Sequence, residues 1–80
     1  MSETQDALLR LIQLMVDQPD DVVLDEIPGS ESTLLELQVA PDDLGKVIGR
    51  QGRTARSLRS LLSARSDQDG KRYEFEILEI

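Results

Sequence analysis

Three closely spaced glycines constrain the fold of this chain more than any other feature of its sequence. Gly45, Gly49 and Gly52 follow Pro41, a residue that suits the first turn of a helix. Each glycine weakens a continuous helix by up to about 1 kcal/mol relative to alanine. A helix that begins near Pro41 is therefore expected to be interrupted after Ile48 and replaced by a short loop.

A second helix is predicted directly after this loop. From Arg53 onward, apolar residues recur at helical spacing and form one stripe of an amphipathic helix. We expect the helix to end near Ala64 or Arg65 and residues 67–70 to form a turn, because Asp and Gly residues gather there. The predicted stripe consists of Ala55, Leu58, Leu61 and Leu62.

The remaining segments predict one helix and three strands. Residues 3–18 have helical periodicity and follow a capping box that pairs Ser2 with Gln5. We expect this helix to end before Pro19. Residues 22–27 and 33–39 are predicted to form a hairpin. The alternating apolar residues from Tyr73 to Ile77 predict a last strand. The order helix, strand, strand, helix, helix, strand predicts one α+β domain over residues 1–80. Its three-stranded mixed sheet should carry the helices on one face.

The charge of the chain is strongly bipolar. Its 80 residues carry a formal net charge of −7. Eight of the nine cationic residues nevertheless fall between positions 44 and 72, where only two aspartates oppose them, so this segment carries +6. Screening over roughly 8 to 10 Å in physiological salt lets an anionic ligand sense the basic segment more than the distant acids.

Composition argues against most catalytic and metal-binding functions. The chain contains no cysteine and no histidine, which removes the usual nucleophile–base pairs and zinc ligand sets. We interpret Asp42 and Asp43 as stabilising the first turn of a helix, not as magnesium ligands. We expect no cofactor, no metal, no small-molecule substrate and no membrane partner, and a cytoplasmic protein, because the apolar runs are far shorter than the roughly 20 residues of a membrane span.

The glycine loop has the properties of a phosphate site. Gly49 and Gly52 flank Arg50 and Gln51 and have no side chains. The backbone of this loop is therefore not covered by bulky groups, and a sugar-phosphate chain can approach it. The start of the next helix adds free N–H groups and a positive dipole. Positive side chains surround the loop, and the candidates for phosphate contact are Lys46, Arg50, Arg53 and Arg56.

The segment from Gly45 to Arg53 resembles the helix–GXXG–helix core of KH domains, and the helix-first order resembles the type II arrangement. The resemblance covers essentially the whole chain and is closest to the small stand-alone bacterial KhpA family. It implies binding of about four nucleotides of single-stranded RNA. It also implies a base-contacting floor at Ile48 and Leu58, and association as a homodimer or with a larger Jag-type KH protein, KhpB.

A different functional class stays open at this point. The chain could be a protein-interaction module in which the KH scaffold persists but the glycine loop is idle. The arginines at positions 50 and 53 argue for the RNA-binding alternative, because an idle loop would not need them.

Overall fold

The computed structural model describes residues 2–79 and confirms the predicted order of elements. Three single-turn 3-10 segments join the longer elements at Pro19–Asp21, Pro41–Asp43 and Arg50–Gly52. The helices and strands are α1 (Glu3–Met15), β1 (Val23–Pro28), β2 (Thr33–Gln38), α2 (Leu44–Ile48), α3 (Arg53–Asp69) and β3 (Tyr73–Ile77).

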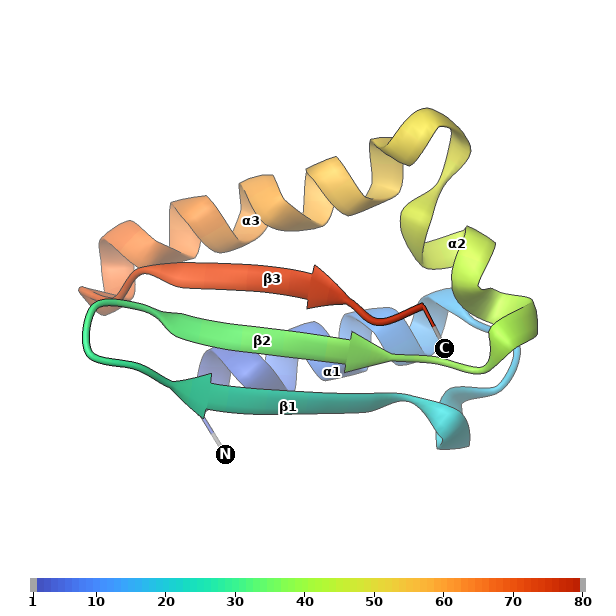
Figure 1. Ribbon diagram of the computed structural model, residues 1–80, viewed down its shortest axis with the longest axis horizontal. Helices are drawn as coiled ribbons and strands as arrows, with labels where there is room; N and C mark the ends of the chain where they lie inside the picture. Colours follow the sequence, from blue (N-terminus) through green and yellow to red (C-terminus); the bar gives the residue numbers. More distant parts are fainter. Residues whose placement is uncertain (1, 80) are drawn as a thin grey trace.

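The three strands form a mixed sheet in the order β1-β2-β3 (Figure 1). β1 and β2 are an antiparallel hairpin in which Leu24 lies opposite Leu37. β3 pairs with β2 in parallel, with Phe75 beside Leu35. A parallel return requires a long crossover, and α2 and α3 supply it. The fold is therefore the α+β arrangement of a type II KH domain.

The helices cover one face of the sheet with a single core. In Figure 1, α1 crosses behind the sheet and α3 runs along β3. Alternate residues of each strand point toward these helices, as the period of two requires. The buried core cluster consists of Leu8, Ile12, Val16, Val22, Leu24, Leu35, Leu37, Val39, Val47, Leu58, Leu62 and Phe75.

The start of α1 confirms the predicted N-cap but not the reciprocal half of the capping box. The Gln5 amide N–H donates to the Ser2 hydroxyl at 3.1 Å. The Gln5 side chain is buried and donates to the carbonyl of Leu24 in β1 at 2.8 Å, instead of turning back to Ser2. It therefore ties α1 to the sheet.

Two predicted boundaries were wrong. α1 ends at Met15 and not near residue 18, because Val16 adopts extended backbone angles. α3 continues through the predicted turn to Asp69, where the Arg65 guanidinium forms an i,i+4 ion pair at 3.1 Å with its carboxylate. Gly70, at φ 66°, then ends the helix in the left-handed conformation.

Asp69 also joins three elements at this end of the molecule. Its carboxylate accepts hydrogen bonds of 2.6 Å from both the Thr4 and the Tyr73 hydroxyl groups. These bonds, followed by the charge of Arg65, hold the pKa of Asp69 below its usual value. Asp69 therefore links α1, α3 and β3.

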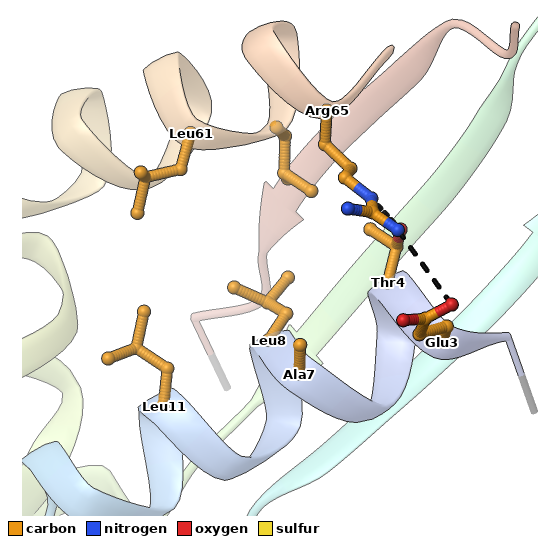
Figure 2. A pocket seen from close by; sticks show the side chains of 8 residues that line it. Glu3, Thr4, Ala7, Leu8, Leu11, Leu61 and Arg65 are labelled. Carbon is orange, nitrogen blue, oxygen red and sulfur yellow. Dashed lines mark hydrogen bonds and ion pairs between the residues drawn. The ribbon is translucent and has the colours of Figure 1, made fainter. Parts of the chain in front are cut away.

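A groove lies between α1 and α3, on the side of these helices that faces away from the sheet (Figure 2). Leu11 and Leu61 face each other across it, and the ion pair between Glu3 and Arg65 lies at one end. The groove encloses about 210 Å³ and is mostly apolar. None of the helices in residues 2–79 has the length and hydropathy needed to cross a membrane.

Candidate nucleic-acid interface

The loop between α2 and α3 is built from left-handed backbone conformations. Gly49 leaves α2 at φ 78°, and Gln51 and Gly52 follow at φ 55° and 74°. The Gly49 N–H donates to the Gly45 carbonyl at 2.8 Å, and the Gly52 N–H to the Gly49 carbonyl at 3.1 Å. Glycine adopts such angles without steric penalty, so the sequence favours the loop at Gly49 and Gly52, whereas Gln51 adopts a left-handed angle that costs a residue with a side chain about 1 to 2 kcal/mol.

The two loop glycines serve different purposes. A Cβ on Gly49 would overlap the Thr54 hydroxyl and lie 2.7 Å from the Thr54 backbone nitrogen. A Cβ on Gly52 would meet only Arg56 Nη1, at 3.9 Å. Gly49 is therefore needed for close packing onto α3. Gly52 is needed for its backbone angle and leaves the outer surface of the loop bare.

Three arginines around the loop are available to an anion. Arg50, Arg53 and Arg56 are all exposed. Within residues 2–79, none of them has a carboxylate within 4.0 Å. Gly52, the N-cap of the 17-residue helix α3, makes no side-chain capping bond to the first N–H groups of the helix, and the positive dipole end of α3 lies at the same place. The predicted site residues are thus brought together, and their charge is not neutralised by the protein.

Lys46 differs from these arginines because the protein already pairs it. Its ammonium group donates to Asp17 at 2.8 Å and lies 3.4 Å from Asp43. The hydrogen bond to Asp17 is the main reason why the pKa of Lys46 lies above its usual value. A phosphate contact of Lys46 stays a prediction, and the structure gives this residue a role in joining α1 to α2.

Asp43 holds the junction between α1 and α2 together, and its contacts show that our interpretation of Asp43 as a capping residue was wrong. Its side chain does not cap its own helix. It is 1% exposed and accepts the backbone N–H groups of Asp17 and Gln18 at 3.1 and 3.0 Å. Burial alone would raise the pKa of Asp43, but these amides and Lys46 outweigh burial and hold it below its usual value. No sequence pattern signals a contact across 26 positions.

A second groove starts at the loop and runs between α3 and the end of β3. It encloses about 360 Å³. Ile48 lies in it, as the resemblance implies, whereas Leu58 is 3% exposed in the core and cannot contact a base. Ile77 contributes to this floor and was missed, because its alternation predicted only a core position. The groove is lined by Ile48, Gly52, Ala55, Arg56, Arg59, Glu76, Ile77 and Glu79.

Comparison with known proteins agrees with this geometry. The family model described as the KH domain of KhpA/KhpB matches residues 5–77, which include both helices around the glycine loop and all three strands. The chain belongs to the KhpA/KhpB KH-domain family. The resemblance drawn from the segment between Gly45 and Arg53 is therefore confirmed.

Relatives named RNA-binding protein KhpA are similar over most of their length. The one from Clostridium acetobutylicum is 47% identical over 64 residues, which cover 80% of this chain and 85% of the relative. The one from Aquifex aeolicus is 46% identical over 79 residues, 99% of this chain and 100% of the relative. No solved structure matches the chain significantly. The KhpA/KhpB assignment thus rests on sequence similarity together with the fold.

Proposed function

We propose that this chain is a KH domain that binds single-stranded RNA without chemically altering it. The observation that carries the proposal is the bare backbone from Gly49 to Gly52 beside three arginines that have no carboxylate partner among residues 2–79. The names of the KhpA relatives, which state that they bind RNA, support it. The lack of histidine and cysteine leaves no ordinary nucleophile–base pair for catalysis.

The geometry suggests how the strand would lie. Phosphates would contact the loop backbone, Arg50, Arg53 and the start of α3, while bases would rest on the apolar floor around Ile48 and Ile77. A site of this kind holds about four nucleotides. Because most contacts are to the backbone of the RNA, sequence selectivity would be low. Such binding suits a cytoplasmic RNA chaperone or post-transcriptional regulator.

A single short site binds weakly, so association with a second RNA-binding domain would raise the apparent affinity through effective concentration. We propose either a homodimer or a heterodimer with a larger KhpB protein. The groove between α1 and α3 supports such an association, because Leu61 is 56% exposed beside it and Leu11 faces it (Figure 2). This groove is separate from the glycine loop, so a partner there would leave the RNA site open.

The test is an RNA titration of the wild type and the double variant Arg50→Asp/Gln51→Asp, followed by fluorescence anisotropy of a short labelled single strand. Lys71→Asp/Gln68→Asp is the matched control, because it changes the charge by the same amount at the other end of α3. Circular dichroism checks the fold of each protein. We expect the loop variant to lose binding and the control to keep it.

Two results would contradict the proposal. Equal binding by the wild type and the loop variant would place the RNA site elsewhere. No binding by the wild type would favour the interaction module with an idle loop, which can be tested by asking whether the folded loop variant still associates with itself or with KhpB.

A further inference from the structure

β1 forms one edge of the sheet, and β3, which lies beside α3, forms the other (Figure 1). Along an antiparallel strand, successive residues point their backbone N–H and C=O groups alternately toward the neighbouring strand and away from it. The hairpin fixes this alternation, because the Gly29 N–H donates to the Ser32 carbonyl at 2.8 Å. Counted back from Gly29, Leu24 and Glu26 turn their backbone groups toward the open edge.

Most of these edge groups have no partner in the fold. The Leu24 carbonyl accepts a hydrogen bond of 2.8 Å from the Gln5 side chain. Within residues 2–79, no side chain bonds the Leu24 N–H or the backbone groups of Glu26. Pro28 ends the edge, because proline has no N–H to offer. Unpaired groups of this kind are a template for another strand.

The side chains of β1 that face away from the helices alternate between apolar and acidic. Val23 and Ile27 are 48% and 44% exposed, and Asp25 lies exposed between them. Asp25 lies opposite Glu36, which lies beside Glu76 on β3, although like charges in such positions destabilise a sheet. Within residues 2–79, no lysine or arginine nitrogen lies within 4.0 Å of these carboxylates. A cation beside Asp25 would relieve this repulsion.

We propose that β1 binds an extended segment of another protein, which adds to the sheet as a fourth strand and places a lysine or arginine beside Asp25. Main-chain hydrogen bonds at the edge supply affinity, and alternate side chains supply specificity. Apolar residues on either side of the cation pack against Val23 and Ile27. A second copy of β1 fits poorly, because this strand contains two acids and no cation. The same acids repel RNA.

This binding surface is separate from the proposed RNA site. The groove beside the glycine loop lies between α3 and β3, at the opposite edge of the sheet from β1 (Figure 1). A basic strand on β1 and an RNA strand at the loop can therefore be held at the same time. The inference does not depend on RNA binding.

Two seven-residue peptides test the inference: Thr-Val-Thr-Lys-Thr-Val-Thr, and the same sequence with glutamate in place of lysine. Both read the same in either direction, so they fit a parallel or an antiparallel strand. Each is titrated to millimolar concentration into 15N-labelled protein, and the amide signals of Leu24 and Glu26 are followed by NMR. The variants are Asp25→Lys and, as a matched control, Glu74→Lys, which changes the charge equally on β3 at the far edge.

We expect the wild type to bind the lysine peptide about fivefold more tightly than the glutamate peptide, because an opposite-charge pair replaces a like-charge pair. Asp25→Lys should reverse this preference, and Glu74→Lys should keep it. The loop variant Arg50→Asp/Gln51→Asp should bind the lysine peptide as the wild type does, whatever its affinity for RNA.

Three results would overturn the inference. The first is a wild type whose Leu24 and Glu26 signals do not move with the lysine peptide. The second is an unchanged preference in Asp25→Lys, with a spectrum that shows the variant to be folded. The third is a movement of these signals with protein concentration alone, which would assign the edge to a second copy of the chain.

Discussion

Gly49 packs directly against Thr54, with no room for a side chain between the loop and the first turn of α3. The contact fixes the direction in which the chain leaves α2, since the Thr54 backbone nitrogen and hydroxyl both lie where a Cβ would be. The geometry of the proposed RNA clamp therefore depends on one glycine and the residue five positions later.

Gly49→Ala should destabilise the protein by about 2 kcal/mol or more, because it combines this overlap with a left-handed backbone angle. Gly45→Ala is the matched control, since a Cβ there meets nothing within 4 Å. The control should be neutral or stabilise the protein by up to about 1 kcal/mol, because alanine favours a helix. Urea unfolding of both variants measures the difference. Equal stabilities would show that Gly49 does not pack as described.

Arg53 and Arg56 should each contribute to the salt dependence of RNA binding. For single strands, the logarithm of the association constant falls with the logarithm of the salt concentration by about 0.7 per phosphate neutralised. Arg53→Ala and Arg56→Ala are each expected to reduce the slope by about this amount. Arg72→Ala, in the connection between α3 and β3, should leave it unchanged. Identical slopes for all three variants would argue against phosphate contacts at the start of α3.

Lys46→Ala should affect stability more than RNA binding. The ammonium group is already paired with Asp17 and Asp43, so its removal leaves the buried Asp43 carboxylate with fewer partners. We expect a lower urea midpoint and a salt slope close to that of the wild type. A slope reduced as much as in Arg53→Ala, with the midpoint unchanged, would instead assign Lys46 to the RNA-binding surface.

Stability should fall in acid because of two aspartates. The pKa values of Asp43 and Asp69 lie below the ordinary value of 3.8, so their contribution is complete above that pH and is lost as the pH drops through the lowered values. We expect urea midpoints to decrease below about pH 4. Asp69→Asn should start from a lower midpoint and lose less on acidification. An unchanged acid dependence in this variant would exclude Asp69 as a cause.

At alkaline pH, stability should instead fall as the pH rises. The pKa of Lys46 is raised from 10.5, chiefly by Asp17, and that of Tyr73 is raised from 10.0, chiefly by burial. Their contributions are complete below these ordinary values and are lost as the pH rises through the raised ones. Without histidine, the chain should have nearly constant stability between about pH 5 and pH 9. A strong pH dependence in that range would contradict this assignment.

The order of the elements and the position of the glycine loop could be predicted from the sequence. Both depend on local properties: apolar periodicity, a proline at a helix start, and backbone angles that glycine adopts readily. The clustering of arginines near Gly52 could also be predicted, because residues close in sequence stay close around a short loop. The length of α3 could not be predicted, since its last turn depends on hydrogen bonds from Thr4 and Tyr73 to Asp69.

The side chains around the loop that are available to a ligand could be identified only from the packed fold. It buries Leu58, opens Ile77 to the groove and pairs Lys46 with carboxylates from two other segments. It also brings Glu76 and Arg56 to the same groove, although 20 positions separate them. All of these differences have one cause. Burial and ion pairing depend on neighbours that the packing of α1 and β3 against α2 and α3 brings together, and local sequence does not record those neighbours.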